Sequence, residues 1–410
     1  MIKTFWETIF DKDRVNTGRQ TELDLLKAFS IIMMIITHCI DDLYAGYADH
    51  LPFVIIDDVL AQSIGAAGFM ICMGAGIAYN KNTSPDSYVR RGISLLMTGQ
   101  LLNIFRYAIP GAIAFLLSGE EPARDFCMLT LSSDILQFAG LFFLCMGLFA
   151  KLGLKGWHIF VISLIANIAA TPLVLKIHTG YYAIDQLIGF VVFTESESYF
   201  PLLHWMIYPA FGIVLGEILQ HVKDKRRFYG IFLVPTAVIW GLYYYFGIFT
   251  EQNTLKFYNE YQSMAYVNQA DGLLQLICNF SMICMFYFLT PLLNDKALTV
   301  VSFISKNINR YYCVHSVLIY YMMFLLGLVF YDHPVNTAGC YILCAVTVTI
   351  TSVIVWLYDK KLYKPMHAFF SRNTGFWYAL IIVITVLACL FASMGPNNYP
   401  HLLNEYNDWI

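Results

Sequence analysis

Charged residues are scarce in this chain of 410 residues. Asp, Glu, Lys and Arg make up 13% of it, hydrophobic residues make up 58%, and the mean hydropathy is +0.60. A typical soluble domain carries roughly twice that share of charge. The composition therefore excludes a soluble protein and indicates a polytopic membrane protein.

Several other features are missing. The ten cysteines include no CxxC pair, and nine of them lie in or beside apolar runs, which argues against a disulfide framework and against a metal site of zinc-ligand spacing. We see no low-complexity linker, no internal repeat and no soluble domain, and we expect no nucleic-acid partner. Residues 1–23 are amphipathic and charged rather than a cleavable signal peptide, so we expect the first span to serve as the targeting signal.

Apolar runs long enough to cross a bilayer recur along the chain, each about 20 residues at about 1.5 Å per residue. The sequence predicts an all-α bundle of about eleven transmembrane helices. The expected spans are 24–43, 58–80, 90–117, 132–150, 156–175, 200–220, 228–249, 270–293, 310–331, 338–358 and 375–394.

Basic residues are distributed unevenly between the loops. They gather in the amino-terminal segment and in every second loop, which leaves only Arg106, Arg124, Lys176 and Lys256 for the other side. By the positive-inside rule we expect a cytoplasmic amino terminus and an outer carboxyl terminus, in the plasma membrane. The chain then divides into a cytoplasmic amphipathic segment, a membrane domain and a short outer tail, at residues 1–23, 24–394 and 395–410.

The first span, LDLLKAFSIIMMIITHCIDDLY, contains Lys27 and His38. Eleven helical residues bring these side chains within about 20° of one another and about 16 Å apart along the axis, so they line one face. Lys27 belongs near the cytoplasmic mouth, where it can hold a phosphate. Alternatively, it snorkels to the interface and pairs with Asp24.

His38 lies toward the outer half, followed at helical spacing by Asp41 and Asp42. A carboxylate there can fix the imidazole tautomer and raise its basicity, as a general base requires. The other interpretation of His38 is a packing or relay role. His50 follows in an acidic outer loop, where it is either a solvated surface residue or a partner of His38.

Ionisable residues inside other spans are functional candidates because charge in a bilayer is costly. Arg106, with Asn103 one turn earlier, belongs to the outer part of the third span. It is predicted either to form an ion pair with Asp134 or to contact substrate, and Gln137 shares the face of Asp134.

The remaining candidates stand at helix starts. His204 begins an outer helix beside Trp205, an ordinary residue of the membrane interface. Arg310 and His315 begin an inner helix, where Arg310 is either a positive-inside anchor or a phosphate contact.

These residues resemble a superfamily of transmembrane acyltransferases. LDLLKAFSIIMMIITH is similar to the first-helix signature shared by acyltransferase family 3 and the heparan-alpha-glucosaminide N-acetyltransferase family. Further segments resemble the second family more closely, in an order that spans roughly residues 19 to 330. They are GAAGFMICMGAGIAYN, YVRRGISLLMTGQLLNIFRY, SSDILQFAGLFFL, YFPLLHWMIYPAFGIVLGE and NINRYYCVHSVLIYY.

Two positions depart from the family pattern. Gln137 is not followed by the usual basic residue, and His204 replaces the proline expected before Trp205. In the glucosaminide family the catalytic histidine lies in the outer loop, about eleven residues after an Asn position that His38 occupies here. His50 follows His38 by twelve, so the chain carries a candidate for each family's histidine.

The resemblance implies transfer of an acyl group, usually acetyl from cytoplasmic acetyl-CoA, to a hydroxyl or amine on a sugar or glycan at the outer face. It implies a catalytic group of His38, His50, Asp41 and Asp42. The implied acceptor contacts are Asn103, Arg106, Asp134, Gln137 and His204. The implied contacts of the acyl-CoA donor are Lys27, Arg90, Arg91, Arg310 and His315.

A transporter of a sugar, a lipid-linked precursor or a proton-coupled solute is the alternative function. The sequence shows no inverted repeat and no paired broken helices, the pattern that often marks secondary transporters. The partners expected are the lipid bilayer, acyl-CoA and a glycan acceptor. The sequence leaves open the acceptor, direct transfer against an acyl-histidine, and whether the chain forms a homodimer.

Overall fold

The computed structural model describes residues 2–44, 51–119, 121–174, 176–177, 179–194, 198–248, 269–329 and 335–394. His50 and the expected outer tail at 395–410 lie outside these residues. Within them the chain is helical, with three isolated bridges and no strand. Helices satisfy their own backbone hydrogen bonds, which a chain in lipid requires.

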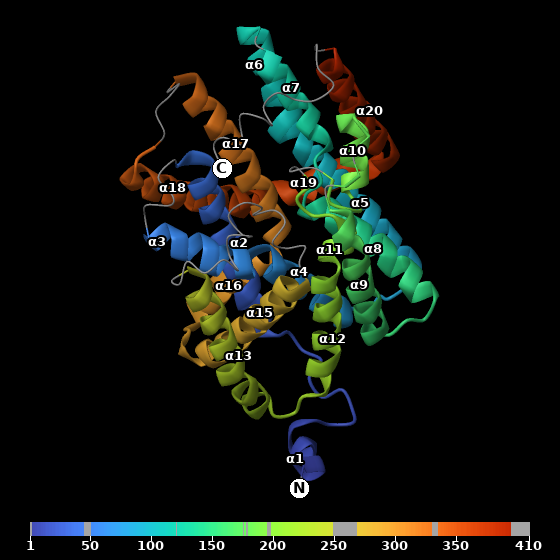
Figure 1. The fold of residues 1–410 in the computed structure, drawn as a ribbon, viewed down its shortest axis with the longest axis vertical. Coiled ribbons are helices and arrows are strands. Elements are labelled where there is room, and N and C mark those ends of the chain that lie inside the picture. Colours follow the sequence, from blue (N-terminus) through green and yellow to red (C-terminus); the bar gives the residue numbers. More distant parts are fainter. Residues whose placement is uncertain are drawn as a thin grey trace.

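The amino-terminal half combines long helices with short ones of four to eight residues (Figure 1). They are α1 (Ile2–Ile9), α2 (Thr21–Leu43), α3 (Leu51–Val54), α4 (Gln62–Ala78), α5 (Pro85–Asn103), α6 (Ile109–Ser118), α7 (Glu121–Asp125), α8 (Ile135–Lys151), α9 (Gly156–Ala170), α10 (Tyr182–Gly189), α11 (Leu202–Trp205) and α12 (Ile207–His221). Two π-helical segments, η2 (Ile55–Ala61) and η3 (Ile104–Ala108), continue directly into α4 and α6.

The carboxyl-terminal half continues the same pattern. Its helices are α13 (Lys225–Ile248), α15 (Gln269–Leu289), α16 (Asp295–Lys306), α17 (Ile308–Val329), α18 (Thr337–Leu357), α19 (Tyr363–Arg372) and α20 (Thr374–Ser393), with the π-helical η8 (Tyr358–Leu362) between α18 and α19. Short 3-10 segments are η4 (Phe126–Leu131), η5 (Thr171–Leu173) and η7 (Thr290–Leu292).

Within the described residues, each of the eleven predicted spans falls on one helix or on consecutive helical segments, which confirms the all-α polytopic bundle. Among the described residues, seven helices are long and apolar enough to cross a membrane, and Ile64–Ala78 and Ile135–Lys151 are shorter apolar helices. The count of eleven crossings and the sides of the two termini remain predictions.

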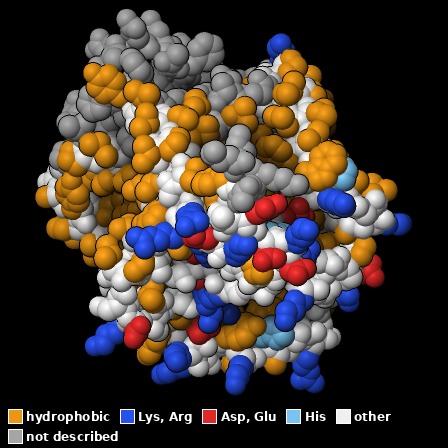
Figure 2. Space-filling view, turned by 90° about the horizontal axis from the view of Figure 1, so that it is seen from below, with side chains coloured by type: hydrophobic (Ala, Val, Ile, Leu, Met, Phe, Trp, Pro, Cys, Tyr) orange, Lys and Arg blue, Asp and Glu red, His pale blue; other side chains and the backbone are white. Residues whose placement is uncertain are grey.

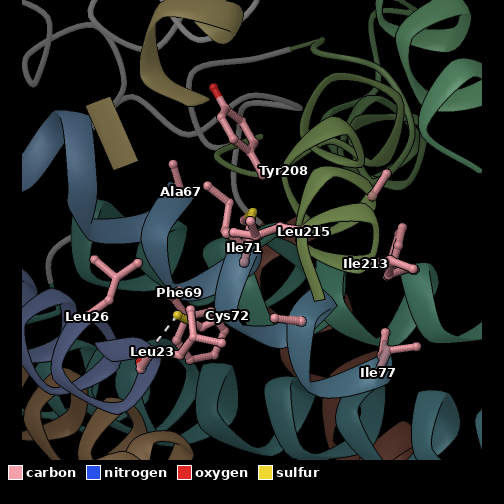
Figure 3. Close-up of a cluster of buried hydrophobic side chains, with 14 of the residues drawn as sticks. Leu23, Leu26, Ala67, Phe69, Ile71, Cys72, Ile77, Tyr208, Ile213 and Leu215 are labelled. Atoms are coloured by element: carbon pink, nitrogen blue, oxygen red, sulfur yellow. Dashed lines mark hydrogen bonds between the residues drawn. The ribbon is translucent and has the colours of Figure 1, made fainter. Parts of the chain in front are cut away.

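The core is built around α2, which contacts α4, α15, α16, α17 and α18. In one part of this core α4 packs against both α2 and α12. Figure 3 shows side chains of these three helices gathered there, among them Leu26, Ile71 and Leu215. The Cys72 thiol donates a hydrogen bond of 3.5 Å to the Leu23 carbonyl across the same seam.

Glycines allow α4 and α12 to approach at backbone distance. A Cβ added at Gly74 would lie 1.9 Å from the Pro209 carbonyl oxygen, and one at Gly212 would lie 2.0 Å from the Ile71 carbonyl oxygen. Small residues at such crossings are the common means of close packing between membrane helices. This contact fixes α4 and, through it, the position of α2.

The substitution Gly74→Ala is expected to lower the stability of the bundle in detergent by about 1–3 kcal/mol or more, because its methyl group overlaps backbone that cannot rotate away. The matched control is Gly76→Ala on the same helix, where a Cβ meets nothing within 4 Å. We expect that variant to be as stable as the parent, or more stable by up to about 1 kcal/mol. Equal unfolding midpoints for the two variants would contradict the close-packing interpretation.

Candidate active site

Lys27 and His38 both lie on α2, half-buried. One turn beyond His38, Asp42 places its Oδ2 atom 3.6 Å from the His38 Nδ1 atom, within reach of an ion pair. Asp42 Oδ2 is buried and has no hydrogen-bond partner in the described part of the chain. Asp41 lies on the exposed side of the helix. The predicted pairing of an imidazole with a carboxylate therefore falls on Asp42.

His315 approaches the same place from α17. Its ring centroid lies 5.6 Å from that of His38, with the planes 33° apart, and the residue is fully buried. From the sequence, His315 is predicted to contact the donor together with Arg310. The structure brings it beside His38 instead, while Arg310 pairs with Asp359 at 2.6 Å and lies over two tyrosine rings.

The buried charges of the third and fourth expected spans meet each other. Arg106, on η3, places Nη2 2.5 Å from Asp134 Oδ2, and both residues are at most 5% exposed. The ion pair that the sequence suggested therefore forms. Asn103 Oδ1 accepts a 2.7 Å hydrogen bond from Arg106 Nη2, while the Asn103 amide donates to the carbonyls of Thr130 and Ser132.

Tyr312 joins this ion pair to the histidines. Its hydroxyl donates a hydrogen bond to Asp134 Oδ1, and its ring meets the His315 ring edge-on at 5.5 Å. Asp134 Oδ1 also accepts from the Ile135 backbone N–H at 2.6 Å, which caps α8. We call the set Asp42, His38, His315, Tyr312, Asp134, Arg106 and Asn103 the polar centre.

Two further tyrosines complete the surroundings of Arg106. The guanidinium lies 4.7 Å from the centre of the Tyr107 ring and 5.5 Å from that of Tyr320, and the two hydroxyls are 2.9 Å apart. Tyr107, Tyr312 and Tyr320 were not predicted from the sequence. Helical spacing could have indicated Tyr312, because it lies three residues before His315 and so on a neighbouring part of the same helix surface.

Within the described residues, the side chains of Gln137 and His204 make no hydrogen bond to the polar centre. Gln137 is buried one turn after Asp134, and a Cβ at Gly99 of α5 would meet its side chain at 2.7 Å. His204, fully buried on α11, lies beside α9, where Asn167 donates to its backbone carbonyl at 3.0 Å. Their role in binding an acceptor remains a prediction.

A second polar site lies at the amino-terminal end of α2. It is a pocket of about 520 Å³ lined by Arg19, Thr21, Glu22, Lys225, Arg226, Tyr287, Phe288, Thr290 and Pro291. Lys225 pairs with Glu22 at 2.7 Å, and Tyr229 donates to Glu22 at 2.9 Å. Lys and Arg side chains crowd the face of the molecule seen from below (Figure 2).

Within the described chain, no contact joins the basic residues that are predicted to bind the donor. Arg90 donates to the Asp86 carbonyl at 3.3 Å, and Arg91 lies 4.5 Å from the centre of the Phe143 ring, both on the exposed face of α5. The pocket draws its cations instead from Arg19, Lys225 and Arg226, which the sequence analysis did not single out.

Comparison with known families bears on the activity. A family model described as the catalytic region of heparan-alpha-glucosaminide N-acetyltransferase matches residues 19–262, more than half of the chain. The chain belongs to this family. No curated protein and no solved structure matches it. Membership confirms the resemblance and identifies a multi-pass membrane protein of an acetyltransferase family. The matched region contains the amino-terminal end of α2, His38, Arg106 and Asp134, whereas Tyr312 and His315 lie beyond it.

The substitution Arg106→Ala is expected to lower stability in detergent by about 3–5 kcal/mol, because it leaves the Asp134 carboxylate buried without a cation. Combining Arg106→Gln with Asp134→Asn removes both charges, so we expect the double variant to lose less than the sum of the two single losses. Arg227→Gln is the control, since its ion pair with Asp224 is largely exposed. Strictly additive losses in thermal unfolding would contradict the coupling.

Proposed function

We propose that the protein transfers an acyl group, most simply acetyl, from acyl-CoA bound at its basic face to a hydroxyl or amine of a sugar or glycan on the opposite side of the plasma membrane. The observation that carries the proposal is the course of α2. The helix begins at the cationic pocket and passes His38 in the polar centre, so one element joins a site suited to phosphates to a site suited to proton transfer.

The pocket has the chemistry of a nucleotide site. Arg226 has no ion pair among the described residues, whereas Arg19 pairs with Asp24 and Lys225 with Glu22. Three cations against one lining carboxylate leave the pocket positive, as the phosphates of CoA require. Tyr287 and Phe288 in the same lining offer rings for an adenine to stack on.

The reacting end of the donor would have to follow α2 inward. Sixteen residues separate Glu22 from His38, about 24 Å along the helix and about 160° around it. Lys27 lies between them in height and within about 20° of the direction of His38. The pantetheine arm would therefore have to cross from the Glu22 side of α2 to the Lys27 side before it carries the thioester along the helix to the polar centre.

At the polar centre His38 is placed to act as the general base, with Asp42 holding its imidazole. His38 takes the proton of the acceptor hydroxyl or amine while that oxygen or nitrogen bonds to the thioester carbon. The carbon–sulfur bond then breaks, and the proton on His38 passes to the departing CoA thiolate.

Arg106 is the group suited to the negative charge that develops on the thioester oxygen. Its Nε–H is buried and has no acceptor in the described part of the chain, while Nη2 is held by Asp134 and Asn103. A fixed donor of this kind stabilises an oxyanion most effectively where water is excluded. Asn103 has its amide engaged by two backbone carbonyls, so it orients Arg106 instead.

Acetyl-CoA is expected to raise the unfolding temperature of the purified protein in detergent. The protein is also expected to release CoA slowly from acetyl-CoA. His38→Gln should lower CoA release by about 10²–10⁴-fold, the usual contribution of a general base, while the stabilisation by acetyl-CoA persists. His367→Gln, on the exposed face of α19, is the matched control.

His50→Gln is measured in parallel. Loss of turnover in the His50 variant with none in the His38 variant would move the base to the loop. Full turnover in both would remove both histidines from the reaction. A wild-type protein that neither binds acetyl-CoA nor releases CoA, but moves a sugar across a vesicle membrane, would replace the enzyme with a transporter.

Charge reversal tests the donor pocket. Arg226→Glu should weaken acetyl-CoA binding about tenfold or more, because it replaces a phosphate partner by a repelling charge. Arg227→Glu is the control, since this adjacent arginine lies outside the pocket lining and contacts Asp224 and Thr8. Equal affinities for acetyl-CoA in the two variants, measured by calorimetry, would place the phosphates elsewhere.

A further inference from the structure

His315 carries a nitrogen that the chain itself leaves unused. Its Nδ1 atom lies 2.8 Å from the Tyr311 carbonyl oxygen, one turn earlier on α17. Its Nε2 atom is buried and has no hydrogen-bond partner among the described residues. An unpaired buried polar atom is uncommon in native structures and costs about 1–3 kcal/mol.

The hydrogen bond to Tyr311 determines which nitrogen holds the proton. A carbonyl oxygen only accepts, so Nδ1 must be the donor. In the neutral imidazole Nε2 then presents a lone pair. The unused atom is therefore an acceptor, and the partner it lacks is an N–H or O–H group.

No N–H or O–H group of the described residues is within hydrogen-bond distance of the His315 Nε2 atom, although the unpaired Nε–H of Arg106 belongs to the same polar centre. His38 of α2 faces His315 and is itself paired with Asp42. Tyr312 of α17 meets the His315 ring and holds Asp134, the partner of Arg106. The Tyr312 hydroxyl already donates its hydrogen bond to Asp134. The ring next to His315 is that of His38, the proposed base, with the centroids 5.6 Å apart, so a group bound at His38 lies next to the His315 ring.

We propose that His315 is a second catalytic histidine, whose Nε2 accepts a hydrogen bond from the acceptor group while His38 removes that group's other proton. This inference rests on the proposed acyl transfer. No bond to His315 forms or breaks in the reaction: it holds and orients the nucleophile, and the transferred proton travels from the acceptor to His38 and then to the CoA thiolate.

Two adjacent acceptors select for a nucleophile with two hydrogens to donate. An amine has them on one atom, a sugar hydroxyl has them when a second hydroxyl is its neighbour, and water has both. An isolated hydroxyl leaves one imidazole unpaired. The site should therefore favour amino sugars and vicinal diols over acceptors with a single isolated hydroxyl, and acetyl-CoA hydrolysis by water should be measurable when no sugar is added.

Two substitutions separate a catalytic role from a structural one. In His315→Asn the amide can replace Nδ1–H toward Tyr311, but nothing replaces Nε2. In His315→Gln the longer side chain brings an oxygen acceptor close to the Nε2 position. Ser316→Ala is the control, because the neighbouring Ser316 is also buried and bonds only to the Tyr312 carbonyl of its own helix.

The experiment measures CoA release from acetyl-CoA in detergent, with water alone and then with glucosamine as acceptor. We expect His315→Asn to lower kcat about 10- to 100-fold, at unchanged unfolding temperature and unchanged KM for acetyl-CoA, and His315→Gln to recover most of the loss. Ser316→Ala should keep the wild-type kcat.

Three results would overturn the inference. The first is a wild-type kcat in His315→Asn. The second is an equal loss in both His315 variants, which a purely structural role predicts. The third is a rise in KM for acetyl-CoA alone, which places His315 at the donor. Each leaves acyl transfer by the wild-type protein intact, whereas a wild-type protein without CoA release or stabilisation by acetyl-CoA defeats the proposed function and this inference together.

Discussion

The ion pair of Arg106 and Asp134 is the interaction on which the polar centre depends. A charge within an apolar bundle persists only when a partner and hydrogen bonds replace its hydration. Asp134 obtains them from Arg106, from the Tyr312 hydroxyl and from the first N–H of α8. One carboxylate therefore joins η3, α8 and α17, three elements far apart in the sequence.

The backbone that carries Arg106 has an uncommon helical form. Arg106 lies in the π-helical η3, in the middle of the long helix that runs from α5 to α6. Such segments are uncommon and frequently accompany functional sites, because the wider turn redirects the side chains that follow. Tyr312, held by Asp134, in turn contacts His315 one turn further along α17, and His315 meets His38. The orientation of the two histidines thus follows from the ion pair.

Much of this arrangement could be predicted from the sequence. Hydropathy located the helices, because an apolar run of bilayer length leaves few alternatives to a helix. The rarity of buried charge identified Arg106 and Asp134 and suggested that they pair. Helical spacing also holds information that the prediction for His315 did not use. Arg310 and His315 are five residues apart, about 140° around a helix, so they face different surroundings.

The cationic pocket could not be predicted in the same way. Its lining joins residues near positions 20, 225 and 290, and no periodicity links them. Which helices become neighbours depends on contacts such as the glycine crossing of α4 and α12, where backbone meets backbone and no sequence spacing specifies the partner. The tyrosines around Arg106 were missed for a related reason. Aromatic residues are common in the spans, and only their tertiary contacts distinguish those that lie beside a buried charge.

The partners of Asp24 change the interpretation of Lys27. The interpretation of Lys27 as a snorkelling residue relied on Asp24 as its partner. Asp24 is instead bound by Arg19 and by the Ser305 hydroxyl, the latter at 2.5 Å, and within the described chain no ion pair reaches Lys27. A half-buried ammonium without an anion is costly. Lys27 lies about 7 Å along α2 beyond Glu22 of the pocket and about 16 Å before His38. In the proposed reaction, a polar group of a donor passing along α2 supplies Lys27 with the partner that Asp24 does not, as the phosphates supply one to Arg226.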